Sequence, residues 1–334
     1  MKAFLIPGVI FLVMILVILL ENGCAGRERS GSGQDRNTGA AAPEEEAVWT
    51  GWNCYQIPDY TEEGRLIRYG YDLITNTSYY LGPKGTVAAL TNGMNCQNCH
   101  LKGGTVPYGN NFGKVFATYP LYRARNNGIQ DIYTRVNDCF QRSLNGKTLD
   151  TASKEMQALY AYIRWVGDGV PKGRALPGTT IMKLRFLDRA ADPAKGKSVY
   201  RDRCATCHGS DGAGQPDAGG TGHLYPPLWG AGSFNDGAGL FRLRAMAGFI
   251  KNNMPLGTTY RSPRLTDEEA WDVAAYIESQ PRPQFDQRAD WKLLAKKPLD
   301  APYGPYIDSF SERQHKYGPY GPIEIAQAAL KKIL

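Results

Sequence analysis

The chain has 334 residues, a formal charge of +7 at neutral pH, 38 glycines and 21 prolines. This length suffices for two domains that each bury a core, and the many turn-forming residues predict long ordered loops. Lysines and arginines form no dense run, so the charge argues against nucleic acid as a partner, although it would attract a small anion.

An apolar run of eighteen residues, 3–20, follows Lys2 and precedes Cys24. It is intermediate in length between the core of a signal peptide and a membrane span of about 20 residues. We therefore expect residues 1–24 to direct export, with three alternatives: a lipid on Cys24, an uncleaved membrane anchor, or a cleaved signal peptide. Each alternative places the protein in the periplasm or on the outer face of a membrane.

Residues 25–46 have no apolar periodicity and are rich in Gly, Ser and charged side chains. This composition predicts a disordered linker that tethers the folded part to the membrane. Cys54 has no evident partner in the sequence. We expect it to be a buried thiol, with a disulfide to another chain as the alternative.

Two Cys-x-x-Cys-His motifs, "CQNCH" at 96–100 and "CATCH" at 204–208, occur in the folded part. This pattern attaches c-type haem, because two thiols at this spacing form thioethers to the haem while the adjacent histidine binds the iron. A redox dithiol or a zinc site is the alternative, but zinc would need four ligands at each site and the chain has only four histidines. We predict two covalently bound haem c groups, held by these residues: Cys96, Cys99, Cys204, Cys207, His100 and His208.

Each motif is followed by a glycine-rich stretch and then by an amphipathic helix. The first predicted helix, 154–166, and the second, 266–279, both repeat apolar residues every three or four positions. Their predicted core faces comprise Met156, Leu159, Tyr160, Ile163 and Val166 in the first helix and Ala270, Val273, Ala274 and Ile277 in the second.

Helix starts are also visible in the sequence. Thr266 and Glu269 form a capping box, and Asp192 followed by Pro193 predicts another helix just before the second motif. Each half therefore reads as helix, haem motif, long loop and helix. This order resembles the class I cytochrome c fold, so we expect an all-α chain with two such domains in tandem.

A haem held by one histidine needs a second axial ligand or keeps an open face. In the second half, Met254 lies 46 residues after His208 and 22 before Tyr276, and Pro255 stiffens its loop. A thioether at such a place is typical of electron-transfer cytochromes c. Met254 is therefore the predicted ligand, with Lys251 and Met246 as rivals.

The first half has no matching methionine, because Met156 lies on the buried face of a helix. Cys139 lies 39 residues after His100 and 23 before Tyr162, almost the position of Met254 in its own half. A thiolate there would lower the reduction potential strongly. We predict that Cys139 is an iron ligand, and a small buried apolar residue is the alternative.

Three segments together are similar to the dihaem thiosulfate dehydrogenases: "LTNGMNCQNCHLKGGTVPYGNNF", "FATYPLYRARNNGIQDIYTRVNDCFQRSLNGK" and "YGPYIDSFSERQHKYGP". The resemblance runs from about residue 56 to residue 320. It implies that the chain joins two thiosulfates into tetrathionate and releases two electrons, or runs the reverse reaction. It also implies a catalytic first haem with His100 and Cys139 as ligands. The second haem, with His208 and Met254, would pass electrons to a soluble or membrane-bound cytochrome.

The chain departs from this family at two positions. Some members carry a lysine directly before the ligand methionine and exchange the two ligands, whereas this chain has Asn253 there. Ala117 stands where the family often has a short polar residue. The first departure argues against ligand switching at the second haem, and the second leaves the shape of the substrate pocket open.

A dianionic substrate needs cationic partners, and the planar guanidinium group of arginine suits an oxyanion. Arg123 and Arg125 lie in "YRARNN", and Arg135 precedes Cys139 by four residues, which on a helix would place the two on one face. The resemblance favours Arg125 as a pocket residue. Solvated surface arginines are the alternative for all three.

The predicted division is an N-terminal cytochrome c domain at 47–175 (the first half), a second at 176–283 (the second half) and a wrapping tail at 284–334. His223 and His315 lie outside the haem motifs and are expected to be structural. The rival functions are a membrane-tethered dihaem electron carrier without its own substrate, and a dihaem peroxidase. Cys139 discriminates against the plain carrier, which would be expected to have methionine there.

Overall fold

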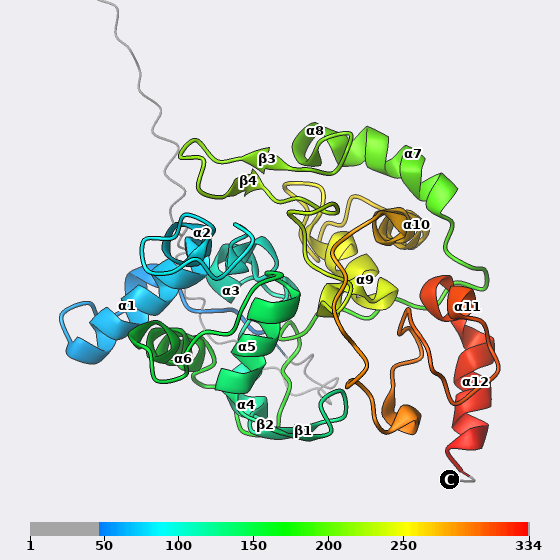
Figure 1. Cartoon of the computed structure of the whole chain (residues 1–334), viewed down its shortest axis with the longest axis horizontal. Coiled ribbons are helices and arrows are strands. Elements are labelled where there is room, and N and C mark those ends of the chain that lie inside the picture. Colours follow the sequence, from blue (N-terminus) through cyan, green and yellow to red (C-terminus); the bar gives the residue numbers. More distant parts are fainter. Residues whose placement is uncertain (1–46, 333–334) are drawn as a thin grey trace, which may run out of the picture.

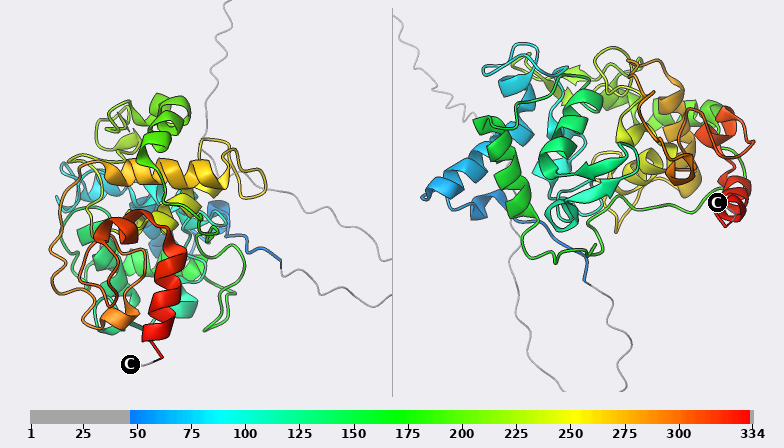
Figure 2. Two further views of the ribbon diagram at one scale, coloured as in Figure 1. Left: turned by 90° about the vertical axis from the view of Figure 1, so that its right-hand side faces the viewer. Right: turned by 60° about the horizontal axis from the view of Figure 1, so that its bottom comes forward.

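The computed structural model describes residues 47–332. The predicted export segment 1–24, with Cys24, and the predicted linker 25–46 lie outside the described residues. Among residues 47–332, no helix combines the length and the apolar character needed to cross a membrane. The first half and the second half lie side by side along the long axis of the molecule (Figures 1 and 2).

The elements of the first half surround its haem motif. Its helices are α1 (Glu62–Thr75), α2 (Thr77–Leu81), α3 (Leu101–Gly104), α4 (Val115–Thr118), α5 (Ile132–Arg142) and α6 (Lys154–Val166), with short 3-10 helices at η1 (Cys54–Gln56) and η2 (Cys96–Asn98). A two-stranded antiparallel hairpin, which the sequence did not predict, is formed by β1 (Leu121–Arg123) and β2 (Gly128–Gln130).

The second half repeats this plan, and the tail follows it. The second half contains α7 (Pro193–Arg203), α8 (Ala205–His208), β3 (Gln215–Pro216), β4 (His223–Tyr225), η3 (Gly239–Phe241), α9 (Leu243–Asn253) and α10 (Asp267–Ser279). The tail contains η4 (Leu294–Lys296), α11 (Glu312–Tyr317) and α12 (Tyr320–Leu330). Strands β3 and β4 form a second unpredicted antiparallel hairpin.

The predicted internal repeat is confirmed by two equivalent helix crossings. In the first half, Gly70 of α1 lies so close to α6 that a Cβ atom there would be 2.1 Å from the carbonyl oxygen of Ala158. In the second half, Gly196 of α7 would place a Cβ atom 1.8 Å from the carbonyl oxygen of Asp272 in α10. In each half the helix before the motif therefore packs directly on the last helix.

The predicted helix starts are also confirmed. The Asp192 carboxylate accepts hydrogen bonds from the first turn of α7, with Pro193 as the first helical residue. Thr266 and Glu269 form the expected capping box of α10. These side chains satisfy backbone N–H groups that have no partner inside the helix.

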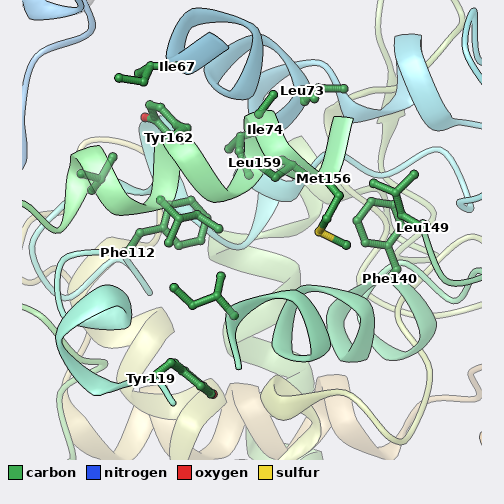
Figure 3. Packing of buried hydrophobic residues seen from close by; sticks show 14 of the residues in the cluster. Ile67, Leu73, Ile74, Phe112, Tyr119, Phe140, Leu149, Met156, Leu159 and Tyr162 are labelled. Carbon is green, nitrogen blue, oxygen red and sulfur yellow. The ribbon is translucent and has the colours of Figure 1, made fainter. Parts of the chain in front are cut away.

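The core of the first half lies between α1, α5 and α6 (Figure 3). Phe140 of α5 and Met156 of α6 face one another there, and both are fully buried. Tyr160, on the predicted core face, is half-buried and packs against this core, while Tyr162, which was not predicted there, is 1% exposed. Tyr162 can be buried because its hydroxyl donates to the carbonyl oxygen of Gly103 at 2.8 Å.

The core of the second half includes part of the tail. The predicted face of α10 is buried, and Tyr320 and Ile323 of α12 pack into the same core. Cys54 is half-buried and takes part in a disulfide, so the expectation of a buried thiol was wrong. It belongs to η1, a short helix without buried residues, so no core encloses its sulfur.

Polar contacts join the two halves. The Asn92 side chain donates to the carbonyl oxygens of Gly232 and Ser233, both at 3.0 Å. In the opposite direction, the Asn235 side chain donates to the carbonyl oxygen of Gln141 at 2.8 Å. The Asn235 bond fixes the end of α5, and the Asn92 bonds fix the loop before the first motif, against the segment that leads into α9.

Candidate active site

A cavity of about 660 Å³ lies where the first haem motif, α5, β1 and the first turn of α9 meet. It is lined by both cysteines of the first motif, Cys96 and Cys99, together with His100 and Cys139. The structure therefore brings the predicted histidine ligand and the predicted cysteine ligand of the first haem into one space.

The orientation and protonation state of the His100 ring suit metal binding through one ring nitrogen. Its Nδ1 atom is hydrogen-bonded to the carbonyl oxygen of Asn110, and Phe112 stacks on the ring at a centroid distance of 4.5 Å. Burial lowers the pKa of His100 to about 4, so the imidazole is neutral near pH 7. Because Nδ1 donates its proton to a carbonyl, the Nε2 lone pair is free for iron.

The remaining lining fits a covalently held haem. Burial raises the pKa of Cys96 to about 11 and that of Cys99 to about 12, and the two cysteines do not form a disulfide. Both sulfurs are thus available for thioether bonds. Apolar side chains line the cavity around them: Ile74, Phe112, Ile132, Leu159 and Ile163. The volume is that of a typical cofactor pocket.

Cys139 lies inside α5, and the helix determines its position. Asp131 caps α5 by accepting the N–H of Thr134 at 2.7 Å. Asn137 and Leu149 exchange two further hydrogen bonds, of 2.8 and 3.0 Å, which hold the helix against the following loop. Cys139 is therefore held on a rigid element.

Arg135 precedes Cys139 by one helical turn, and both line the cavity, as the predicted spacing requires. The charge of Cys139 is the largest influence on the pKa of Arg135 and raises it, ahead of desolvation, which lowers it. Hydrogen bonding to Tyr119 contributes in the same direction as Cys139. The Arg135 guanidinium and the Cys139 sulfur therefore lie within electrostatic range of one another on the cavity wall.

The cavity has a large excess of positive charge. Among the described residues that line it, eight are cationic and one is a carboxylate, Asp138, which accepts a hydrogen bond from Gln130 at 2.9 Å. The cationic residues are Lys114, Arg123, Arg125, Arg135, Arg142, Lys183, Arg242 and Arg244. Such a lining favours anions over neutral ligands.

Two of these arginines are the predicted pair on and after β1. Arg123 donates from Nη1 to the hydroxyl of Tyr119 at 3.2 Å. Arg125 donates from Nη1 to the carbonyl oxygen of Gly237 in the second half at 2.9 Å. Both therefore belong to the cavity rather than to the solvated surface, as Arg135 does. Ala117 is buried and is not part of the lining.

Sequence reasoning missed several lining residues. Arg142 and Ser143 follow Cys139 by about one helical turn, so the helical period could have indicated them. Arg242 and Arg244 come from the first turn of α9, more than a hundred residues away, and Lys183 comes from the connection between the halves. No local pattern marks these distant residues, because only the packing of the halves brings them to the cavity.

The second motif has the same histidine arrangement. His208 Nδ1 is 2.9 Å from the carbonyl oxygen of Pro226, and burial lowers the pKa of this histidine. Cys204 and Met254 both pack against the core of the second half. Met254 follows directly after the end of α9, on the predicted loop.

The rival ligands of the second haem are engaged elsewhere. Lys251 donates to the carbonyl oxygen of Leu265 at 2.7 Å and pairs with Asp267 at 2.7 Å. Met246 is 4% exposed in the second core. These contacts favour Met254 as the sixth ligand, which stays a prediction.

The two other histidines lie outside the cavity. His315 is fully buried in the tail, with Nδ1 at 2.7 Å from the carbonyl oxygen of Leu299 and Nε2 at 2.9 Å from Asp308. His223 of β4 is 3.3 Å from the carbonyl oxygen of Gly93, across the junction of the halves. Both sets of contacts are those of structural residues.

Comparison with known proteins identifies both domains. Residues 87–171 match the family model "SoxA/TsdA, cytochrome c domain", and residues 193–281 match the family model "Cytochrome c". Each of these domains binds a haem c covalently, so the chain carries two. Both motifs have the free thiols and the oriented histidine that such haems require.

Individual proteins similar to this chain are thiosulfate dehydrogenases. A thiosulfate dehydrogenase of Stutzerimonas stutzeri is 41% identical over 221 residues, which are 66% of this chain and 69% of the relative. One of Allochromatium vinosum is 42% identical over 200 residues, which are 59% of this chain and 72% of the relative.

A solved structure, thiosulfate dehydrogenase (TsdBA) from Marichromatium purpuratum, is also similar. It superposes with a TM-score of 0.65 at 32% identity and covers 71% of this chain, and the chain spans only 50% of that protein. Since curated relatives above 40% identity are matched over more than two thirds of their length, the chain belongs to the thiosulfate dehydrogenase family of dihaem cytochromes c.

Proposed function

We propose that this chain couples two thiosulfate dianions oxidatively to one tetrathionate dianion. The new bond joins the outer sulfur atoms of the two thiosulfates, and two electrons leave, with no proton or other group released. The observation that carries the proposal is a single cavity that contains His100, Cys139 and eight cationic side chains. The names of the similar proteins support the choice of substrate.

The main obstacle to this reaction is electrostatic. At an effective dielectric constant of about 20, each pair of like unit charges 4 Å apart costs about 4 kcal/mol, and two dianions contain several such pairs. Cationic groups fixed in a partly dry cavity offset this repulsion without having to reorganise. The excess of arginine over carboxylate in the lining matches that requirement.

We assign the roles as follows. Arg123, Arg125 and Arg135 bind the sulfonate ends, because a guanidinium group donates two parallel hydrogen bonds to an oxyanion. Cys139 presents its sulfur beside Arg135, where the outer sulfur of a bound thiosulfate can approach it. When bound, the first haem supplies a one-electron acceptor held by His100 and Cys139.

The second half provides the exit for the electrons. His208 and Met254 would hold the second haem, and a thioether ligand raises the potential, as an electron acceptor for the first haem needs. An external soluble or membrane-bound cytochrome receives the electrons in this proposal. Export and tethering through residues 1–46 would place the chain where haem c is attached and where such a partner is available.

One assay tests the proposal. Oxidised holoprotein is mixed with thiosulfate and an artificial one-electron acceptor at mildly acid pH, and both acceptor reduction and tetrathionate are measured. We expect one tetrathionate for each two thiosulfates consumed. The reverse reaction is tested with tetrathionate and a reduced donor. No turnover in either direction would contradict the proposal and leave a tethered electron carrier as the function.

A further inference from the structure

The chain segment after α10 crosses from the second half to the first-half cavity. This segment, residues 283–303, is called the strap below. It descends beside α9 toward the β1–β2 hairpin (Figure 1). There the backbone N–H of Trp291 donates to the carbonyl oxygen of Arg125 at 2.9 Å, and the Trp291 side chain lines the cavity. The strap thus reaches one of the proposed substrate-binding arginines.

Asp290 forms the shortest ion pair of this contact, with Arg142. Its two carboxylate oxygens accept hydrogen bonds from both Nη atoms of Arg142, each at 2.8 Å. The side chains of Arg142 and Asp290 are only 7% and 6% exposed. The Arg142 guanidinium also lies over the ring of Phe285, 4.3 Å from its centroid. A buried bidentate pair of this kind has a fixed geometry.

Arg125 is held on one side by the same strap. Its Nε atom lies 3.8 Å from the carboxylate of Asp290, and its guanidinium lies over the ring of Trp291 at 5.4 Å. Its Nη1 atom donates to the carbonyl oxygen of Gly237. Burial lowers the pKa of Arg125 to about 10, so the group is still a cation near pH 7. Nε itself is buried and has no hydrogen-bond partner among the described residues, so part of the donor capacity of Arg125 is unused in the cavity wall.

The backbone conformation of Trp291 indicates that the contact between the strap and Arg125 has a role in ligand binding. Trp291 has a φ angle of +58°, a left-handed conformation that bulky residues rarely adopt. The bond to Arg125 and a bond from its indole N–H to the hydroxyl of Tyr303, at 3.2 Å, hold it there. Strained residues that their surroundings fix in place are frequent at ligand-binding sites.

We propose that Asp290 and Trp291 are positioning residues, which aim the guanidinium of Arg125 at a tetrahedral dianion in the cavity. Asp290 at the same time neutralises Arg142, so that Arg142 supports Arg125 rather than competing for the substrate. This inference rests on the proposed function, because thiosulfate is the dianion concerned. It assigns a role in substrate binding to the strap, which contains no haem motif and none of the predicted catalytic residues.

The test compares Asp290→Asn with Asp286→Asn in the holoprotein. Asp286 belongs to the same strap but forms an exposed ion pair with Arg288, so it is a matched control. We expect Asp290→Asn to raise KM for thiosulfate about tenfold, since a buried charge pair is broken, while kcat changes less than about twofold. Asp286→Asn should leave both constants unchanged.

The direction of the change in KM distinguishes a positioning role of Asp290 from a purely electrostatic role. Removing a carboxylate makes the cavity more positive, so a purely electrostatic role of Asp290 would lower KM. An unchanged or lower KM therefore overturns the proposal. If Asp290→Asn does not fold, Trp291→Leu takes its place, with an expected rise in KM of about threefold because the ring beneath Arg125 is lost.

Sulfate, an unreactive tetrahedral dianion, separates this inference from the proposed reaction. Its affinity for the oxidised holoprotein is measured by calorimetry. An affinity that is about tenfold weaker in Asp290→Asn than in wild type supports the positioning role even if the wild type turns over no thiosulfate. Equal affinities in the two proteins contradict it, whatever the activity assay shows.

Discussion

Cys139 and Met254 occupy corresponding places in the two halves, but their backbones differ. Cys139 lies within α5, whereas Met254 is the first residue after α9. The helix therefore fixes the cysteine rigidly and brings Arg135 to the same wall of the cavity. If both residues bind iron as predicted, a cysteine sulfur one helical turn from a guanidinium would suit an anionic substrate, while a thioether on a loop would suit electron transfer.

The first prediction concerns Cys139. Replacing it with glycine should lower kcat more than about 100-fold, because the substitution removes both an iron ligand and the sulfur of the site. Both haems should stay attached, since Cys96, Cys99, Cys204 and Cys207 are untouched. The measurements are the thiosulfate assay and the haem content per chain of the purified variant.

Cys139→Met is the matched comparison, because it keeps a sulfur atom but removes the negative charge. We expect the potential of the first haem to rise in this variant, as measured by a spectroscopic redox titration. Full activity of Cys139→Gly, or an unchanged potential in Cys139→Met, would show that Cys139 is only a buried apolar residue.

Among the elements, the crossing of α7 and α10 depends on one glycine. A methyl group at Gly196 would lie 1.8 Å from the carbonyl oxygen of Asp272, so Gly196→Ala must push the two helices apart. We expect the free energy of unfolding to fall by about 1 to 3 kcal/mol, the usual cost of overpacking. Denaturant unfolding of the holoprotein measures it.

Gly321 in α12 provides the control for this prediction, because a Cβ atom there would meet no atom within 4 Å. Gly321→Ala should leave the stability unchanged or raise it slightly, since alanine favours the helix. Equal effects of the two substitutions would contradict the close packing of α7 on α10.

The tail contains a buried lysine that makes stability depend on pH. Lys297 is 5% exposed, and its ammonium donates to the carbonyl oxygens of Tyr303 at 2.5 Å and Pro305 at 3.1 Å. Burial lowers its pKa from 10.5 to about 8. Between these values the unfolded chain binds a proton that the folded chain does not, so the free energy of unfolding rises with pH in this window.

The expected rise from pH 8 to pH 10.5 is about 1 to 2 kcal/mol after allowance for solvent screening. It is measured as the difference between wild type and Lys297→Met, which cancels the titration of tyrosines. Lys292→Met, at an exposed lysine of the same segment, should keep the dependence of the wild type. A difference between wild type and Lys297→Met that stays constant with pH would show that Lys297 remains charged when buried.

At the scale of the whole molecule, more of the fold than of the candidate site could be predicted from the sequence. The motifs, the caps of α7 and α10 and the periodicity of α6 and α10 are local signals, and these predictions are confirmed. The residues that line the cavity, by contrast, come from distant parts of the sequence. Arg142 and Asp290 are 148 residues apart, and the first turn of α9 meets β1 only after the halves pack together.

Contacts between elements within one half also explain what the sequence did not predict. Tyr160 fits the helical period and packs half-buried against the core. Tyr162, outside the predicted face, is buried as well, because Gly103 supplies a carbonyl partner for its hydroxyl. The β1–β2 hairpin, which presents Arg123 to the cavity, is too short to produce an alternating pattern in the sequence. Features that need a partner from another element are therefore the ones that single-sequence reasoning misses.

The last prediction concerns the passage of electrons between the halves. Met254→His replaces a thioether ligand by an imidazole, which should lower the potential of the second haem by about 0.1 V or more. One-electron transfer becomes tenfold less favourable for each 59 mV, so kcat should fall more than about tenfold. KM for thiosulfate should not change, because Met254 is not part of the cavity lining.

Redox titration and steady-state assays of Met254→His measure both effects. Met246→Leu is the control, since Met246 is a buried core residue of α9 and should leave the potential unchanged. If only Met246→Leu shifted the potential of the second haem, the ligand assignment would be reversed. If Met254→His lowered that potential but kcat stayed constant, electrons would leave the first haem directly, and the second half would serve the reaction only by completing the cavity with Arg242 and Arg244.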